Sequence, residues 1–227
     1  MTMAERIHSL QGVIHELEAS YHRQKGSVTL LAVSKGHASP CIERAFAAGL
    51  DQFGESYLQE ALVKINALPH LPICWHFVGR VQRNKAAAIA IHFSWVHGVC
   101  QIKTAQSLND ARPDGMEPLN ICIQINLDDE PTKSGVSTVD VPELVAKIIQ
   151  LPKVTLRGFM VIPKPLHDEK EQYHSFLRAR ALLHTINSQF GLTLSTLSMG
   201  MSDDFPAAIR AGSTMIRIGR AIFGSRT

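Results

Sequence analysis

The sequence predicts an α/β protein built as a single (β/α)8 barrel of the TIM type, with an extra helix at its N-terminus. Short apolar runs of strand length alternate along the chain with amphipathic stretches of helical spacing. Eight such strand candidates occur, and this alternation favours parallel strands joined by right-handed crossovers. The 227 residues also match the length that such a barrel needs, about 200 to 250 residues.

The elements can be placed in order along the chain. A first helix is indicated by apolar residues at helical spacing, namely Ile7, Leu10, Val13, Ile14 and Leu17. The strand candidates span residues 28–33, 52–54, 73–78, 94–99, 119–126, 154–160, 193–198 and 214–218. Helices are expected over residues 40–48, 56–66, 84–91, 102–111, 141–150, 170–190 and 203–211. Gly49 and Gly212 stand where helices commonly end.

The composition narrows the class of protein. Hydrophobic residues make up 45% of the chain, and the formal net charge of +3 is scattered, which argues against a nucleic-acid surface. No apolar run approaches the ~18 residues that a membrane span requires. Four cysteines without a C-x-x-C pair favour free thiols in a reducing compartment. Because no Pro-, Gly- or Ser-rich linker divides the chain, we expect one cytoplasmic domain, residues 1–227.

A lysine at the end of the first predicted strand is the first candidate for chemistry. In barrels of this type the working residues cluster at the carboxyl ends of the strands, and Lys35 follows the buried run 28–33. Burial disfavours a lysine's charge, so such a residue needs a partner or a task. The ordinary interpretation is a lysine that extends to solvent. The functional one is a desolvated amine that forms a Schiff base with an aldehyde.

Two loops near the C-terminus are suited to binding an anion. Residues 198–204 end the seventh predicted strand and open a helix, where backbone N–H groups beside the small Gly200 can bind an anion. The eighth strand runs through Arg217 into Gly219 in the same way. Loops after strands seven and eight often hold phosphate in these barrels. Ordinary helix capping would explain either loop alone, but both together with a strand-end lysine favour a phosphate site.

Other candidate residues give weaker signals. A lone histidine such as His76 is more often a hydrogen-bonded core residue than a catalyst, and Asn126 ends the fifth predicted strand. The acidic segment 128–130 lacks a known ligand spacing, so a solvated turn is favoured over a metal site. The motifs G-x-x-x-x-G-K-[ST], H-E-x-x-H and G-x-S-x-G are missing from the sequence. Nucleotide hydrolysis, zinc proteolysis and α/β-hydrolase chemistry therefore lack support.

Several segments form a recognisable pattern, in order and over nearly the whole chain. The segments are Leu31-Ala-Val-Ser-Lys35, Phe53-Gly-Glu-Ser-Tyr57, Trp75-His-Phe-Val-Gly79, Gln82-x-Asn-Lys85, Lys133-Ser-Gly135, Arg157-Gly-Phe-Met160, Leu197-Ser-Met-Gly-Met-Ser-Asp-Asp204 and Gly212-Ser-Thr-Met-Ile-Arg-Ile-Gly219. The last two are the most specific. Together the segments resemble one known family, the pyridoxal phosphate homeostasis proteins.

The resemblance implies the fold of the alanine racemase N-terminal domain, PLP fold type III, without that enzyme's second domain. It implies that Lys35 holds pyridoxal 5′-phosphate (PLP) as an internal aldimine and that Arg217 faces the pyridine nitrogen. Ser202 and the backbone around Gly219 and Arg220 would hold the phosphate. Further residues near the pocket would be Met199, Gly200, Ser213, His76 and Asn126. An arginine offers only donors, so the pyridine nitrogen would stay unprotonated and the ring a poorer electron sink.

The chain departs from the family's usual pattern in three places. Arg220 stands where the family usually has threonine, so a hydroxyl for the phosphate is lost, although the guanidinium can pair with the phosphate instead. Ser56 replaces the usual asparagine of Gly-Glu-Asn-Tyr. Gly36 and His37 replace the threonine and lysine that usually follow Lys35. These changes bear on affinity and phosphate geometry more than on the Schiff base.

Three functions stay open at this point. The leading hypothesis is a non-catalytic PLP-binding protein of intracellular vitamin B6 homeostasis, which buffers the cofactor or delivers it to PLP-dependent apoenzymes. The second is a PLP-dependent enzyme with weak amino-acid racemase activity, although the domain that supplies a second acid/base is missing. The third is a barrel enzyme that uses Lys35 on a sugar phosphate without a cofactor. We expect a monomer with no metal, nucleic-acid or membrane partner.

Overall fold

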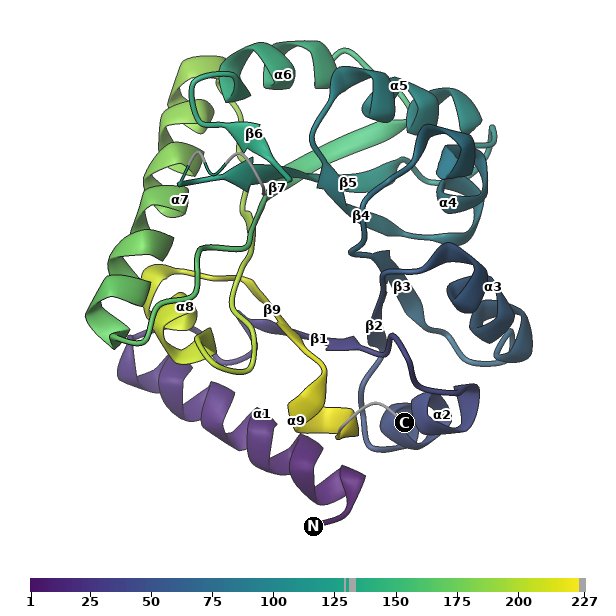
Figure 1. Ribbon diagram of the computed structural model, residues 1–227, viewed down its shortest axis with the longest axis vertical. Helices are drawn as coiled ribbons and strands as arrows, with labels where there is room; N and C mark the ends of the chain where they lie inside the picture. Colours follow the sequence, from purple (N-terminus) through teal and green to yellow (C-terminus); the bar gives the residue numbers. More distant parts are fainter. Residues whose placement is uncertain (129, 131–133, 225–227) are drawn as a thin grey trace.

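The structure, a computed structural model, describes residues 1–128, 130 and 134–224, and in these residues nine strands form one sheet. The strands are β1 (Thr29–Val33), β2 (Gln52–Glu55), β3 (Cys74–Phe77), β4 (Trp95–Val99), β5 (Leu119–Asn126), β6 (Val136–Ser137), β7 (Val154–Val161), β8 (Thr196–Ser198) and β9 (Met215–Ile218). Neighbouring strands pair in parallel, and β4 also pairs with β5. Eight strands therefore close into a barrel, with β6 added beside β5 (Figure 1). The predicted (β/α)8 barrel is confirmed.

Helices surround the barrel (Figure 1). They are α1 (Met3–Ser20), α2 (Ser39–Ala47), α3 (Leu58–Ala67), α4 (Ala86–His92), α5 (Ile102–Ala111), α6 (Val141–Ile148), α7 (Glu169–Phe190), α8 (Phe205–Ala211) and α9 (Arg220–Phe223), with a short 3₁₀ helix η1 (Arg83–Lys85) before α4. The last strand is followed by a helix of a single turn, α9. The extra N-terminal helix α1 packs against α8, α9 and α2 and so completes the ring.

A buried carboxylate ties the N-terminal helix to the barrel. Thr2 and Glu5 form a reciprocal capping box that starts α1. At the other end of the helix, the carboxylate of the fully buried Glu18 accepts hydrogen bonds from the backbone N–H groups of Gly26 (2.9 Å) and Val28 (2.8 Å). These bonds fix the turn that leads into β1. They also satisfy a buried charge that would otherwise destabilise the fold.

The structure differs from the sequence-based expectation at a few short elements. The strand expected from residue 193 begins only at Thr196, because the side chain of Asn187 in α7 captures both the N–H (2.9 Å) and the C=O (2.8 Å) of Leu194. Those backbone groups are thus withheld from the sheet. The two-residue β6 was not predicted, since an element this short carries no periodic pattern. The helix start expected after Gly219 is present as the four-residue α9.

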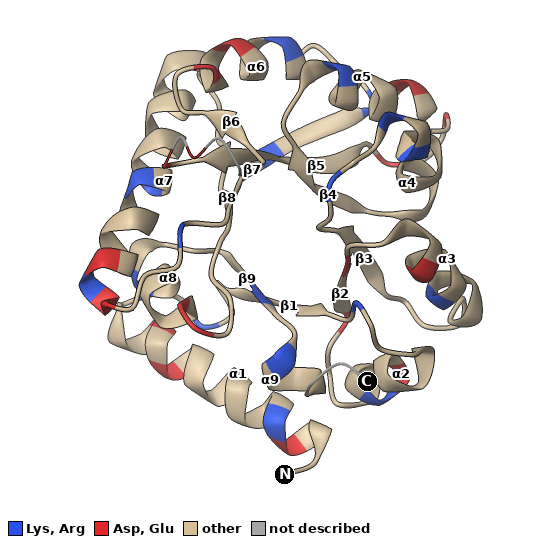
Figure 2. Ribbon diagram, in the orientation of Figure 1, with Lys and Arg blue, Asp and Glu red and all other residues tan. Residues whose placement is uncertain are grey.

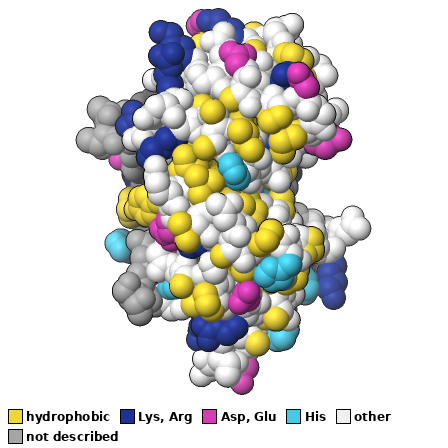
Figure 3. All heavy atoms as spheres, turned by 90° about the vertical axis from the view of Figure 1, so that its right-hand side faces the viewer, with side chains coloured by type: hydrophobic (Ala, Val, Ile, Leu, Met, Phe, Trp, Pro, Cys, Tyr) yellow, Lys and Arg dark blue, Asp and Glu magenta, His cyan; other side chains and the backbone are white. Residues whose placement is uncertain are grey.

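The surface mixes charge and apolar groups. Basic and acidic residues alternate around the outer helices (Figure 2). On the face over α3 and α4, apolar side chains lie among histidines and charged groups (Figure 3), and Tyr57, Val63 and Ile91 are exposed there. All four cysteines are free, as predicted. In the described part of the chain, no helix is long and apolar enough to span a membrane.

Candidate functional site

A cavity of about 230 Å³ opens at the carboxyl ends of β1 and β9. Its lining consists of Val33, Lys35, His37, Val78, Ile162, Met201, Ser202, Asp203, Arg217, Gly219, Arg220 and Gly224. Half of the ten predicted site residues meet in this cavity, namely Lys35, Ser202, Arg217, Gly219 and Arg220. They come from three separate parts of the chain, which the closure of the barrel brings together. The position agrees with the usual working end of such barrels.

Lys35 lies in the turn that follows β1, which the N–H of His37 closes by donating to the carbonyl of Ser34 (3.1 Å). Val33 and Lys35 line the cavity, whereas the hydroxyl of Ser34 between them donates to Glu55 Oε1 (2.6 Å). The neighbouring strand β9 lies in register with β1, with Leu31 opposite Arg217. This register sets Arg217 beside the strand that carries the lysine.

Arg217 is held rigidly at the inner end of the cavity. Its guanidinium Nη1 donates to the carbonyl (2.5 Å) and the hydroxyl (3.0 Å) of Ser198, and Nη2 donates to the carbonyl of Val161 (2.9 Å). Burial lowers the pKa of Arg217 to about 10, against the opposing effect of Asp204. The side chain therefore stays cationic at neutral pH. A fixed guanidinium presents donors and no acceptor to whatever occupies the cavity.

A chain of hydrogen bonds runs from Arg217 through the interior of the barrel. Ser198 Oγ accepts from Arg217, so its own proton faces His97 Nδ1 (2.8 Å). His97 Nε2 then donates to His76 Nδ1 (3.0 Å), and His76 Nε2 donates to Gln52 Oε1 (2.9 Å). These partners assign one tautomer to each ring. Burial lowers the pKa of His76 to about 3 and that of His97 well below its ordinary value, so both are neutral.

The rim of the cavity carries two exposed charges. Arg220 Nη2 lies 3.3 Å from Asp203 Oδ2, and the two side chains are 75% and 85% exposed. The sequence predicts a helix start at Asp203, but α8 begins at Phe205. The reason is that the Asp204 carboxylate accepts the N–H of Met201 (2.6 Å) and closes a turn before the helix. This turn leaves Met201, Ser202 and Asp203 on the cavity wall.

Three of the other predicted site residues shape the walls without lining the cavity. The hydroxyl of Ser213 donates to the carbonyl of Met199 (2.7 Å), and both residues are fully buried. Gly200 accepts the backbone N–H of Arg217 (2.9 Å). Its φ of +98° and the Cβ of Ala208, 2.7 Å from where a Cβ would stand, require glycine there. These residues set the positions of β8 and β9.

Asn126 and His76 also lie away from the cavity lining. The Asn126 side chain binds the backbone of Glu130 in both directions, at 2.9 and 3.2 Å, and so braces the turn after β5. Asp129 and Lys133, which belong to predicted motifs, lie outside the described residues. Among the residues that the structure describes, no group of three or more His, Cys, Asp or Glu side chains could hold a metal ion.

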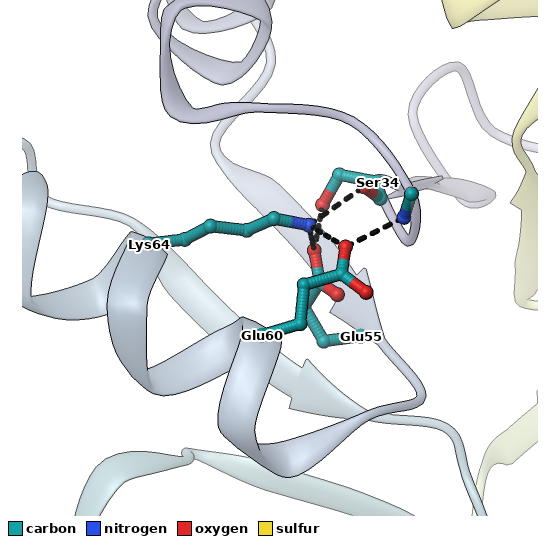
Figure 4. Close-up of polar contacts among 5 residues, drawn as sticks. Ser34, Glu55, Glu60 and Lys64 are labelled. Atoms are coloured by element: carbon teal, nitrogen blue, oxygen red, sulfur yellow. Dashed lines mark hydrogen bonds and ion pairs between the residues drawn. The ribbon is translucent and has the colours of Figure 1, made fainter. Parts of the chain in front are cut away.

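A buried ionic cluster that the sequence did not reveal bonds to Ser34 and Gly36, the residues on either side of Lys35. Figure 4 shows the side chains of Ser34, Glu55, Glu60 and Lys64 in this cluster. Lys64 Nζ donates to Glu55 Oε1 (2.6 Å), to Glu60 Oε1 (2.6 Å) and to the carbonyl of Ser34 (2.8 Å). Glu60 Oε1 also accepts the N–H of Gly36 (2.6 Å). Burial raises the pKa of Glu55 by more than its partners Lys64 and Ser34 lower it. Two signals in the sequence bear on this cluster: the strand-end segment Phe53-Gly-Glu-Ser-Tyr57, which contains Glu55, and the i,i+4 spacing of Glu60 and Lys64.

Comparison with known proteins shows which family this barrel belongs to. The sequence profile of the alanine racemase N-terminal domain family matches residues 9–227. The pyridoxal phosphate homeostasis protein of Pseudomonas aeruginosa is 48% identical over 225 residues, which is 99% of this chain and 96% of that protein. The protein of the same name from Escherichia coli K12 is 41% identical over 230 residues, covering 99% of this chain and 98% of that protein.

Solved structures of similar proteins have the same fold. PipY of Synechococcus elongatus PCC7942, solved with PLP bound, matches with a TM-score of 0.87 and 35% identity over 98% of this chain and 100% of that chain. Alanine racemase from Corynebacterium glutamicum matches at a TM-score of 0.73 and 18% identity, with 98% of this chain covering 62% of that one, which shows the fold alone. The fold and cavity define a barrel of the alanine racemase N-terminal class. Within that class, the chain belongs to the pyridoxal phosphate homeostasis protein family.

Proposed function

We propose that this protein binds PLP in the cavity between β1 and β9 and serves intracellular PLP homeostasis. The observation that carries the proposal is the meeting of Lys35, Arg217 and Ser202 in one cavity. The names of the relatives at 48% and 41% identity, and a similar barrel solved with PLP bound, support it.

The chemistry of the cavity fits the cofactor group by group. The Lys35 amine suits an aldehyde, the donors of Arg217 suit an unprotonated ring nitrogen, and the hydroxyl of Ser202 with nearby backbone N–H groups suits a phosphate. A Cβ at Gly219 would stand 3.1 Å from the carbonyl of Val33, so the end of β9 lies close against β1. The narrow cavity therefore contains an amine for the aldehyde, hydrogen-bond donors for the ring nitrogen and hydrogen-bond donors for the phosphate.

We propose that Lys35 holds the cofactor covalently. Lys35 would supply the amine that holds the aldehyde group of the cofactor as a Schiff base, with the aldehyde oxygen lost as water. When bound, PLP supplies a conjugated ring that can accept an electron pair from a bound amine. Three acceptors on β7 and β8 fix the guanidinium of Arg217. Because a guanidinium can only donate, it would leave the ring nitrogen unprotonated and so weaken the ring as an acceptor of electrons. Holding PLP is therefore favoured over turnover.

We accordingly propose a non-catalytic cytoplasmic monomer that buffers PLP or delivers it to PLP-dependent apoenzymes. The alternative function, weak amino-acid racemisation, requires a second acid/base group on the ring face opposite Lys35. Formation of D-alanine from L-alanine, followed by chiral chromatography, separates the two. D-Alanine formation that depends on both PLP and Lys35 would favour the racemase.

The first experiment is the absorbance spectrum of the purified protein with and without added PLP. Wild type should give the visible band of a protonated Schiff base, and Lys35→Ala should lose it. A wild-type protein that gives no such band at saturating PLP would contradict the covalent proposal. A band of equal strength in Lys35→Ala would move the attachment to another amine.

A further inference from the structure

We propose that Lys64, Glu60 and Glu55 form a positioning cluster that fixes the backbone on both sides of Lys35. The inference rests on the proposed function of Lys35 and names the residues that orient it. Glu55 ends β2, and Glu60 and Lys64 lie one turn apart on α3. Their side chains meet around Ser34 (Figure 4), and none of them lines the cavity between β1 and β9.

The cluster holds the residue before Lys35 and the residue after it. The carbonyl of Ser34 accepts from Lys64 Nζ (2.8 Å), and its hydroxyl donates to Glu55 Oε1 (2.6 Å). The N–H of Gly36 donates to Glu60 Oε1 (2.6 Å). Gly36 has a φ of +79°, so the chain turns sharply at this point. A rotation of the Lys35 backbone would break hydrogen bonds on both of its sides.

Lys64 is the hub of the cluster. An ammonium group carries three donors, and three acceptors surround Lys64 Nζ, one each from Ser34, Glu55 and Glu60. The side chain is 4% exposed, and that of Glu55 is fully buried. Taking such charges out of water offsets most of their attraction, and apolar residues of similar volume are often equally stable in such places. Added stability therefore does not account for the cluster, whereas a fixed geometry does.

A second Glu–Lys pair in the chain has the same spacing but is exposed to solvent. Glu143 and Lys147 on α6 have the same i,i+4 spacing as Glu60 and Lys64, but their side chains are 73% and 52% exposed. A solvated pair of this kind contributes little to stability or geometry. Glu60 and Lys64 differ because they are packed against the ends of β1 and β2, where they bond to the backbone on both sides of Lys35. Lys147 thus offers a matched control for Lys64.

If the cluster positions Lys35, its loss should affect ligands that form a Schiff base and spare ligands that do not. Displacing a reacting group by about 1 Å can cost about 100-fold in a reaction that depends on its geometry. Loosening the cluster should therefore weaken the Schiff base at Lys35. It should leave binding of the ring and phosphate unchanged, because Arg217 and Ser202 do not contact the cluster through any hydrogen bond found among the described residues.

The test compares PLP with pyridoxine 5′-phosphate, which has an alcohol in place of the aldehyde and cannot form a Schiff base. In Lys64→Met and Glu60→Ala, we expect PLP affinity to fall by about tenfold or more, with pyridoxine 5′-phosphate affinity within about twofold of wild type. Glu60→Gln keeps an acceptor for the N–H of Gly36 and should recover most of the PLP affinity. Lys147→Met should change neither affinity.

Parallel loss of both affinities would overturn the proposal, because it would mean that the cluster merely supports the fold. Unchanged PLP affinity in both variants would also overturn it. If Lys64→Met does not fold, Glu60→Ala carries the same comparison, since the Glu60 side chain is 31% exposed and tolerates truncation better. Failure of the proposed function is separate, because wild type itself would then show no Lys35-dependent visible band.

Discussion

Two arginines border the cavity, and they differ in how firmly they are held. Arg217 is buried and bonded to three acceptors, whereas Arg220 is 75% exposed and lies 3.3 Å from Asp203. Exposed ion pairs contribute little, so Arg220 can exchange Asp203 for another anion at small cost. The inner arginine thus sets geometry, and the outer one adds an electrostatic attraction that salt can screen.

Removing the competing carboxylate should strengthen phosphate binding. We expect Asp203→Asn to raise PLP affinity by about two- to fivefold at low salt and Arg220→Ala to lower it by a similar factor, as exposed charge pairs do. Both effects should vanish in about 1 M salt, where the screening length is about 3 Å. Absorbance titrations at two salt concentrations measure this. Asp114→Asn, which removes another exposed carboxylate, is the control, and effects that persist in high salt would contradict a purely electrostatic role.

The site residues that could be predicted from the sequence are those that lie at or just after the carboxyl end of a strand. Lys35 and the loops that carry Ser202 and Arg217 were predicted from their positions at strand ends, which meet where a parallel barrel closes, and the family resemblance supplied the individual roles of Ser202 and Arg217. Lys64 was missed, and Glu55 was noted only within the segment Phe53-Gly-Glu-Ser-Tyr57, because the role of both depends on how α3 packs against β1 and β2. In sequence, a glutamate and a lysine four residues apart indicate only a solvated pair.

Among the elements, β7 and β8 approach each other very closely at Gly158. A Cβ at Gly158 would stand 2.0 Å from the carbonyl oxygen of Thr196, and the φ of Gly158 is +153°. The two residues lie opposite each other in the parallel register. This contact places β8, and with it Ser198, beside Arg217. A side chain at Gly158 would therefore displace the strand that holds the inner arginine.

Two glycine-to-alanine substitutions should act in opposite directions. Gly158→Ala should lower the free energy of unfolding by about 2–4 kcal/mol through steric conflict and backbone strain. Gly12→Ala lies inside α1, where nothing stands within 4 Å of the added Cβ, and should raise it by about 0.5–1 kcal/mol. Urea denaturation measures both. A Gly158→Ala protein as stable as wild type would show that β7 and β8 can separate without cost.

At the scale of the whole molecule, the closed barrel brings side chains from five strands into one hydrogen-bonded chain. The path from Arg217 through Ser198, His97 and His76 to Gln52 uses residues of β9, β8, β4, β3 and β2. The sequence predicted closure from the number of strands. It did not show this chain, because strands buried on both faces read as continuous apolar runs that hide which side chains point inward. His97 was missed for that reason.

The two inner histidines make the stability of the whole barrel depend on pH. Burial holds the pKa of His76 at about 3 and that of His97 well below its ordinary value, while unfolding returns both to about 6.5. The unfolded chain then binds more protons, so stability rises with pH. The contribution is complete above about pH 6.5 and is lost as the pH falls from there toward the folded pKa values, by about 1 kcal/mol per pH unit for each ring.

His76→Asn isolates this effect, because the asparagine oxygen can still accept from His97 Nε2 while one titrating ring is removed. Unfolding free energies from urea titrations at about pH 7, 6 and 5 should fall less steeply in this variant than in wild type, by about 1 kcal/mol per pH unit. His70→Asn, which removes a ring that is 60% exposed, should leave the slope unchanged. Equal slopes in wild type and His76→Asn would mean that His76 takes up a proton without unfolding. The one-directional chain of donors from Arg217 to Gln52 would then be wrong, because a protonated His76 would have a donor where His97 Nε2 needs an acceptor.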